Sequence, residues 1–468
     1  MTDGHSIEHI IVLMLENRSF DHMLGFLPNG GELTGREFNL VNPADPNSER
    51  VFVNNQAGYV SKIDPLHDLP GVNTQLFGAG DTSTDPAPMN GFVKSCLVAA
   101  GGDVKMGKTI MDCFDPVKLP TLSALAQEFC LCDRWFSSVP GPTWPNRLFV
   151  HAATSDGIAT NDVLHPYDMR TLYDNLAAQG LSWGVYFGDF PVSLALRRLW
   201  GHLDRFKRFE AFRDEVTSGT LPNYAFIEPR YFDFLAWKAN DDHPPHDVRF
   251  GEYLVADVYA TLRASKLWEK SLFIVLFDEH GGFYDRFSPP RPVPNPDNQD
   301  SQNPPLDFTR LGMRVPAVLV SPLIERGRVD STGYEHASIP ATVKKLFGLP
   351  AFLTARDAAA TAFESVLSLS TPRTDTPMTL PVPRRPRGAQ DQRALLHVEA
   401  AESTARAMGL PQARSQAPLS EFQETLVQLA GIIGARRLAE MALPPIPIRT
   451  EYEAAEYVRD RLSSFLER

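Results

Sequence analysis

Two pairs of neighbouring oxygen-bearing side chains are the first candidates for chemistry in this sequence. Glu16 is followed by Asn17, and Asp278 is followed by Glu279. Carboxylate and carboxamide oxygens are ligands that hard divalent cations prefer. Two acids side by side are also costly if they are buried without a counter-charge, so a metal ion or an arginine should lie near the second pair.

Each pair also has an ordinary structural interpretation. The first pair could begin a helix, with Asn17 or Ser19 as the N-cap and Glu16 near the positive end of the helix dipole. The second pair could lie in a solvated turn, because Gly281 and Gly282 follow it and permit positive backbone angles. The hypothesis of a metal site therefore requires the two pairs to meet in the fold.

A single threonine is displayed by a turn rich in proline, Pro140–Arg147, which reads PGPTWPNR. The hydroxyl of Thr143 is a poor nucleophile until a base or a bound cation removes its proton. Most threonines in such a turn cap the next helix, and that alternative remains open for Thr143.

Four histidines lie in polar segments typical of loops: His67, His243, His246 and His336. Two of them belong to the unusual cluster DDHPPHD at Asp241–Asp247. Imidazoles can stabilise a phosphoryl group or transfer protons, but a loop with solvent-exposed histidines has the same pattern. Zinc bound by these histidines alone is disfavoured, because the chain lacks an HExxH helix and a CxxC pair.

The elements that must position these residues are short apolar strands alternating with helices. The pattern predicts an α/β protein with a mostly parallel central sheet covered by helices on both faces. Ligands of such sheets bind beyond the carboxyl ends of the strands, so the two pairs could meet there. The predicted strands are Ile10–Leu15, Trp183–Phe187, Tyr224–Ile227, Leu272–Phe277 and Ala317–Val320, and the predicted helices are Leu119–Phe129, Thr171–Gln179, Val248–Ser265 and Ala337–Phe347.

Proline-rich segments divide the chain. Residues 288–316 predict a lid or binding loop directly after the second acidic pair. We expect one catalytic domain over residues 1–370, a Pro/Arg-rich linker over residues 371–387 and a helical C-terminal appendage over residues 388–468. Capping boxes at Ser420 and Thr450 predict two helix starts in the appendage, which packs on the catalytic domain or on a second subunit.

Composition narrows the classes of function. The 57 acidic and 45 basic side chains give a net charge of -12, which disfavours nucleic-acid partners and broad adsorption to anionic membranes. The four cysteines suggest buried thiols rather than a disulfide framework. We find no signal peptide and no membrane-spanning segment, so we expect a cytoplasmic location unless a signal-independent route exports the protein.

Taken together, the motifs resemble those of the bacterial and plant non-specific phospholipase C and acid phosphatase family. The resemblance implies an alkaline-phosphatase-like fold. It spans residues 10 to about 347 in the order of the family, and the matching segments are ENRSFDHMLG at Glu16–Gly25, MNGFV at Met89–Val93, PGPTWPNR at Pro140–Arg147, DDHPPHD at Asp241–Asp247, FDEHGGFYD at Phe277–Asp285 and MRVPAVLVSP at Met313–Pro322.

The resemblance also implies roles for individual residues. It makes Thr143 the nucleophile, and the chain departs from the acid-phosphatase branch, which has a serine there and Asp-Asp as its second acidic pair. The implied ligands of one divalent cation of unspecified identity are Glu16, Asn17, Asp278 and Glu279, and the implied contacts to the transferred phosphoryl group are His67, His243 and His336, with His246 as a fourth. Met23 and Leu24 replace an aromatic pair of the first motif, which we interpret as a change in packing.

The resulting expectation is a phosphoesterase of the phospholipase C type. It would cleave a phospholipid similar to phosphatidylcholine into diacylglycerol and a phosphorylated head group, with a metal-activated threonine as nucleophile. Its partners would be a phospholipid or another phosphoester substrate, with transient contact to a membrane surface and no nucleic acid. The alternatives are an acid phosphatase acting on small phosphomonoesters and a non-catalytic binding protein on the same scaffold.

Overall fold

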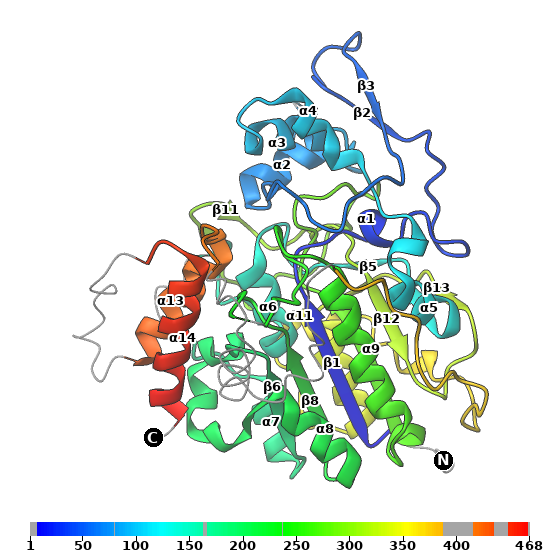
Figure 1. Cartoon of the computed structure of the whole chain (residues 1–468), viewed down its shortest axis with the longest axis vertical. Helices are drawn as coiled ribbons and strands as arrows, with labels where there is room; N and C mark the ends of the chain where they lie inside the picture. Colours follow the sequence, from blue (N-terminus) through cyan, green and yellow to red (C-terminus); the bar gives the residue numbers. More distant parts are fainter. Residues whose placement is uncertain are drawn as a thin grey trace.

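A large mixed sheet forms the centre of the molecule (Figure 1). The computed structural model describes residues 7–78, 80–161, 166–235, 237–386, 415–434 and 448–466. Within these residues the sheet has eight strands, in the order β13 (Arg328–Asp330), β4 (Cys130–Cys132), β12 (Ala317–Val320), β9 (Ser271–Phe277), β1 (His9–Leu15), β8 (Tyr224–Glu228), β6 (Trp183–Phe187) and β7 (Phe206–Arg208).

The five strands from β9 to β7 run parallel, as their continuous apolar runs predict. All five predicted strands are present with boundaries within one residue, and β1 lies in the middle with every residue buried. The predicted mostly parallel α/β architecture is confirmed.

One predicted strand departs from the parallel arrangement, because β12 pairs antiparallel with both β9 and β4. Between β9 and β12 the chain stays beyond the carboxyl end of β9 and makes no helical crossover. It must therefore re-enter the sheet from that edge and run in the opposite direction. A short apolar run suits a parallel or an antiparallel buried strand equally well, so the composition of β12 could not reveal its direction.

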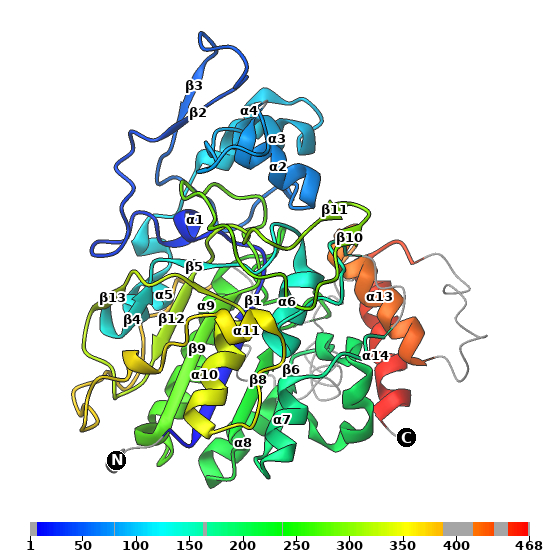
Figure 2. The same cartoon turned by 180° about the vertical axis from the view of Figure 1, so that it is seen from behind.

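Helices cover both faces of the sheet. The face toward the viewer in Figure 1 carries α8 (Phe209–Ser218) and α9 (Arg249–Arg263), with α5 (Pro120–Glu128) packed against α9. The opposite face, seen in Figure 2, carries α6 (Thr143–Ala152), α7 (Leu172–Ala178), α10 (Ser338–Phe347) and α11 (Ala355–Ala359). The four predicted helices correspond to α5, α7, α9 and α10, with ends shifted by one or two residues.

An N-terminal excursion between β1 and α5 sits above the carboxyl ends of the parallel strands (Figure 1). It has its own buried cluster, which includes Val72, Phe92 and Met111 and takes in Phe283 from the second acidic motif. The sequence did not predict its elements: α1 (Phe20–Leu24), β2 (Phe38–Leu40), β3 (Arg50–Phe52), α2 (Leu69–Phe77), α3 (Phe92–Ala99) and α4 (Val104–Lys108).

The predicted lid segment, residues 288–316, is irregular apart from the short pair β10 (Ser301–Gln302) and β11 (Pro305–Leu306). Arg356 fastens this segment to the body, since its Nε donates to the carbonyl of Pro294 at 2.6 Å. A second small pair joins β5 (Trp135–Phe136) to β14 (Tyr334–Glu335). The remaining turns of 3₁₀ helix are Thr109–Met111, Pro116–Lys118, Val192–Ala195, Arg197–Arg205, Trp268–Lys270 and Glu364–Val366.

The predicted linker has neither helix nor strand over residues 371–386. It runs along α9, where the hydroxyl of Tyr253 donates to the carbonyl of Pro383 at 2.9 Å and that of Tyr259 to Pro377 at 2.6 Å. Arg387 and, within the predicted appendage, residues 388–414, 435–447 and 467–468 lie outside the described residues.

Two helices of the predicted appendage are described, α13 (Glu421–Gly434) and α14 (Glu451–Leu466), and they pack against each other. Both predicted capping boxes are present, through Ser420 with Gln423 and Thr450 with Glu453. The pair also docks on the body of the same chain, for example through Trp200 stacked edge-on against Phe465.

Two further predictions concern the chain as a whole. All four cysteines are buried free thiols, as predicted. Among the described helices, none combines the length and apolar character that crossing a bilayer requires.

Candidate active site

The register of β1 and β9 brings the two oxygen-bearing pairs together. Leu15 and Phe277, the last residues of these parallel strands, lie opposite each other. The next residues, Glu16 and Asp278, therefore leave the sheet side by side, and the backbone N–H of Asp278 donates to the carbonyl of Leu15 at 3.2 Å. Both carboxylates are fully buried, and so is Glu279. The alternative of a solvated turn for the second pair is therefore wrong.

Asn17 joins the pairs in a backbone conformation unusual for a residue with a side chain, with φ of 66°. Its backbone N–H donates to Asp278 Oδ1 at 2.9 Å, and its Nδ2 donates to Glu279 Oε1 at 3.0 Å. Its Oδ1 is buried and has no partner among the described residues. Gly281, with φ of 63°, makes room for it, because a Cβ at that position would lie 2.4 Å from Asn17 Oδ1. The helix cap in this motif is Ser19.

Thr143 is the first residue of α6 and lies against the same cluster. Its hydroxyl is buried and donates to Glu16 Oε2 at 3.4 Å. The turn that presents it is held by Asn146, whose Nδ2 donates to the carbonyls of Val139, Gly141 and Pro142. Thr143 does not cap α6, since Pro142 is the N-cap residue and no side chain caps the helix.

Arg147, one turn after Thr143, supplies a counter-charge that the sequence analysis anticipated only in general terms. Its Nε donates to Glu16 Oε1 at 2.9 Å and to Asp278 Oδ2 at 3.1 Å, and an Nη lies 2.6 Å from Glu16 Oε1. Arg147 is the last residue of the PGPTWPNR motif, so its place in that motif could have identified it as the counter-charge. The net charge of this group is −2 when Glu16, Asp278 and Glu279 are ionised and Arg147 is protonated. One divalent cation would neutralise it.

Electrostatics favour an additional cation in this cluster. Burial raises the pKa of Glu16 well above its usual range, against the opposing effect of Arg147. Burial likewise raises the pKa of Glu279 to about 8, against the opposing effect of His67. Without a further positive charge nearby, the raised pKa values favour the protonated forms of Glu16 and Glu279. A bound metal ion would take the place of those protons. The oxygen donors and the unpartnered Asn17 Oδ1 therefore fit a hard divalent cation.

His67 and His243 form the next part of the site, with ring centroids 6.1 Å apart. Each uses Nδ1 to bond a backbone carbonyl, of Pro65 and of Pro244 respectively, and each has a buried Nε2 without a partner among the described residues. Asp64, which the sequence analysis missed, joins them, and the ligand atoms of the three residues lie within 4.8 Å of one another. They could bind a phosphoryl oxygen or a cation.

Charge differs between these two imidazoles. Burial alone lowers the pKa of His67, but Glu279 and Asp64 outweigh it and raise that pKa to about 9. Burial lowers the pKa of His243. At neutral pH one ring is therefore cationic and its neighbour is neutral, which suits one donor to a phosphoryl oxygen and one group that accepts or returns a proton.

His336 has no ring nitrogen left for a phosphoryl group. Its Nε2 lies 2.5 Å from the carbonyl of Asp278, and its Nδ1 accepts a hydrogen bond from Trp135 Nε1 at 3.3 Å. Burial lowers its pKa to about 4, so the ring is neutral and donates to Asp278 through Nε2. It stands behind the carboxylate cluster and fixes the backbone there.

His246 is also engaged at both nitrogens. Its Nδ1 lies 2.6 Å from Asp241 Oδ1, and its Nε2 lies 3.3 Å from Glu451 Oε1 at the start of α14. Burial opposes its protonation, but the two carboxylates raise its pKa well above the usual value. Asp241 in turn accepts the backbone N–H of Glu16 through its carbonyl at 2.7 Å. Through Asp241, His246 thus holds the backbone of Glu16 in place at the end of β1.

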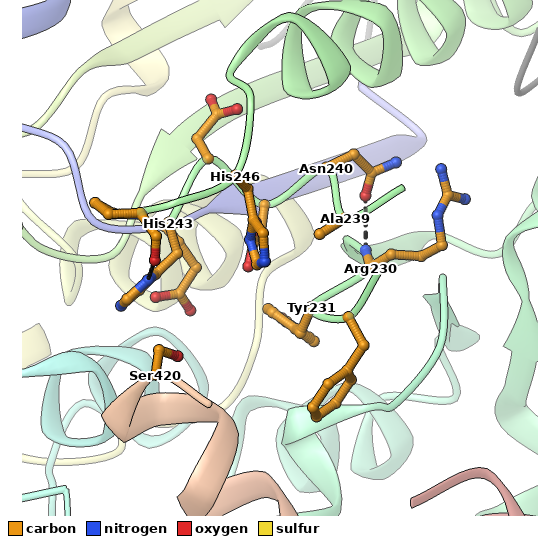
Figure 3. A network of polar contacts seen from close by, with 12 residues as sticks. Arg230, Tyr231, Ala239, Asn240, His243, His246 and Ser420 are labelled. Carbon is orange, nitrogen blue, oxygen red and sulfur yellow. Dashed lines mark hydrogen bonds and ion pairs between the residues drawn. The ribbon is translucent and has the colours of Figure 1, made fainter. Parts of the chain in front are cut away.

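The C-terminal helices contact the residues next to the site, a feature the sequence did not predict. Trp144, which follows Thr143, donates its indole N–H to Thr425 Oγ1 of α13 at 2.7 Å. Gln423 of the same helix donates to the carbonyl of Tyr231 at 2.7 Å. Tyr231, His243 and His246 belong to the segment that follows β8 (Figure 3). Helix α13 therefore packs against the segments that carry Thr143 and Tyr231.

Comparisons with known proteins identify relatives of this chain. A sequence profile described as the Phosphoesterase family matches residues 7–350. Non-specific phospholipase C1 of Arabidopsis thaliana is 41% identical, over 98% of this chain and 86% of the relative. Phospholipase C B of Mycobacterium tuberculosis is 28% identical, over 81% of this chain and 82% of the relative. A solved protein in the alkaline phosphatase superfamily from Vibrio parahaemolyticus is a more distant likeness, at 13% identity and a TM-score of 0.34, covering 55% of this chain and 67% of that one.

Proposed function

The chain belongs to the phosphoesterase family, and from this membership we propose that it is a phospholipase C that cleaves a phosphatidylcholine-like lipid. Relatives named phospholipase C match nearly the whole chain, which supports hydrolysis of a phosphodiester. The names of these relatives suggest the lipid substrate, and the mechanism rests on the site itself. The observation that carries the mechanism is the buried hydroxyl of Thr143, 3.4 Å from Glu16 inside a cluster of acids.

Glu16, Asn17, Asp278 and Glu279 would hold one divalent cation. When bound, such an ion lowers the proton affinity of a neighbouring hydroxyl and offsets charge on phosphoryl oxygens. Arg147 keeps the carboxylates of Glu16 and Asp278 in place whether or not the ion is present. The side chains of the cluster are buried, which strengthens each of these charge interactions.

Thr143 is the proposed nucleophile. Its oxygen forms a bond to phosphorus while the bond from phosphorus to the glycerol oxygen breaks, and Glu16 is the nearest acceptor for the hydroxyl proton. The product alcohol, diacylglycerol, takes up a proton as it leaves. A water molecule then attacks the phosphothreonine ester, which releases the phosphorylated head group and restores the hydroxyl.

His67 and His243 are the proposed groups that touch the phosphoryl group. Their Nε2 atoms are buried and unpartnered within the described residues, and His67 lies close enough to Glu279 for the charges to interact. The cationic ring of His67 can stabilise negative charge on a phosphoryl oxygen or protonate the departing oxygen, and the neutral ring of His243 can accept a proton. For His246 and His336 we propose a positioning role, because their ring nitrogens already bond protein groups.

Parallel assays on two substrates test the proposal. Purified protein is given phosphatidylcholine in mixed micelles and p-nitrophenyl phosphate, each with and without a chelator. We expect diacylglycerol and phosphocholine from the lipid, loss of this activity on chelation, and recovery when a divalent cation is returned. Rapid cleavage of the aryl phosphate with an intact lipid would favour a phosphomonoesterase. Absence of turnover on both substrates would favour a non-catalytic binding protein.

A further inference from the structure

A cavity of about 300 Å³ lies outside the site described above, between α8, α9 and the proline-rich segment. None of the proposed catalytic or metal-binding residues lines it. Its volume falls at the lower end of the range typical of small-molecule sites. The nearest link to the active site is Asn240, which lines the cavity and precedes Asp241.

The lining combines an apolar wall with cationic groups. Phe250 and Leu254 of α9 are buried, and Leu380 and Val382 come from the proline-rich segment. A ligand with a short hydrocarbon part would lose its contact with water against these side chains. Val382 is 50% exposed, so the segment forms the outer edge of the cavity.

The charges around the cavity favour an anion. Three arginines line it, Arg213, Arg230 and Arg385, against the two acids Glu210 and Asp257. Arg213 forms an ion pair with Asp257, and Arg230 Nε donates to the carbonyl of Lys238 at 2.9 Å. The local excess of positive charge contrasts with the net charge of -12 of the whole chain. Guanidinium groups match the planar, paired oxygens of carboxylates and similar oxyanions.

Arg230 and Trp237 provide the most specific recognition. Arg230 lies over the Trp237 ring at 4.7 Å, and its backbone N–H donates to Asn240 Oδ1 at 2.7 Å. Its side chain extends away from His243 and His246 (Figure 3). The indole N–H of Trp237 is buried and has no acceptor within the described part of the chain, a state that costs free energy until a ligand oxygen accepts it.

We propose that this cavity binds an amphiphilic oxyanion, a molecule with one carboxylate or sulfonate-like group and a short hydrocarbon chain. The oxyanion faces Arg230, Arg385 and the Trp237 N–H, and the chain packs on Phe250, Leu254 and Leu380. The proline-rich segment is then a wall of a binding site as well as a connection to the C-terminal helices.

Calorimetric titration of the full-length protein tests the proposal with four probes: octanoate, octanesulfonate, octanol and inorganic phosphate. We expect one octanoate or octanesulfonate per chain. Octanol and phosphate should bind at least about tenfold more weakly, because each carries only one of the two recognised features. Equal binding of octanol and octanoate would overturn the recognition of an anion.

Three variants locate the binding. Arg385→Glu should weaken octanoate binding by about tenfold or more, whereas Arg384→Glu, an exposed neighbour that does not line the cavity, should change it by less than about threefold. Val382→Trp should block the cavity from its exposed edge. Unchanged octanoate binding in folded Val382→Trp, or equal losses in the two arginine variants, would place the ligand elsewhere and overturn the proposal.

Discussion

Replacement of Arg147 by methionine removes the guanidinium counter-charge of the carboxylate cluster, so that the effect of the proposed metal ion on stability can be measured by itself. Methionine keeps much of the volume of the side chain but leaves the buried carboxylates of Glu16 and Asp278 without their guanidinium. Removal of one partner from a buried ion pair costs about 3–5 kcal/mol. Because burial already favours the protonated form of Glu16, we expect a loss near 3 kcal/mol in metal-free protein, or about 3–6 °C in Tm for a chain of this length.

A divalent cation should restore part of this loss. A divalent ion and a unit positive charge about 5 Å apart repel each other by about 6–7 kcal/mol at an effective dielectric constant near 20, so removal of the guanidinium strengthens binding by up to that amount. Tighter binding to the folded state raises its stability by mass action. We therefore expect the rise in Tm on adding cation to be larger in Arg147→Met than in the wild type.

Scanning calorimetry with a chelator, and then with calcium, magnesium, manganese or zinc, measures both effects. Arg314→Met is the matched control, because Arg314 is equally buried and pairs with Asp21 and Asp285 away from the carboxylate cluster. It should lose stability without a larger response to cation. If cation raises the Tm of Arg147→Met no more than that of the wild type with every metal, the ion does not bind beside Arg147 and the account of the cluster is wrong.

Three further predictions test other parts of the molecule. His67→Gln should lower kcat on phosphatidylcholine about 100-fold, since it removes the cationic donor to the phosphoryl group, while Tm changes little; a normal kcat would exclude that role. Thr425→Val deprives the buried Trp144 N–H of its acceptor, and denaturant unfolding should show a loss of about 1–3 kcal/mol together with a reduced kcat. Burial lowers the pKa of His151 to about 3, below its unfolded value near 6.5. The unfolded chain therefore binds a proton between these pH values that the folded chain does not, so the stability that the neutral ring contributes above pH 6.5 is lost as pH falls toward 3. His151→Asn should therefore reduce the slope of unfolding free energy against pH in that window by up to about 1.4 kcal/mol per unit, and an unchanged slope would contradict it.

The sequence predicted best the strands whose residues are buried on both faces of the sheet. Strands such as β1 and β9 are continuous apolar runs, and the polar residues after them mark their ends. By contrast, β4, β7 and β13 have three residues each, too few to show a pattern. The places of β4 and β13 in the sheet also depend on partner strands more than a hundred residues away, which no local pattern specifies.

For the site, the sequence indicated which residues gather but not which way each one faces. Neighbouring strand ends made the meeting of Glu16 and Asp278 foreseeable. Polar surroundings suggested a loop position for His336, and its ring is buried between Trp135 and the backbone of Asp278. The contact of Trp144 with Thr425 joins positions 281 residues apart, and an amphipathic helix does not reveal what its apolar face will cover.

The central claim is that Thr143 becomes covalently phosphorylated beside the carboxylate cluster. Rapid acid quenching during turnover of phosphatidylcholine, followed by mass spectrometry of peptides, measures this directly. The account predicts a phosphocholine adduct on Thr143 in the wild type, little of it after chelation, and none in Thr143→Ala, which should also lose turnover. A Thr143→Ala protein with near-normal activity, or an adduct on a different residue, would contradict it.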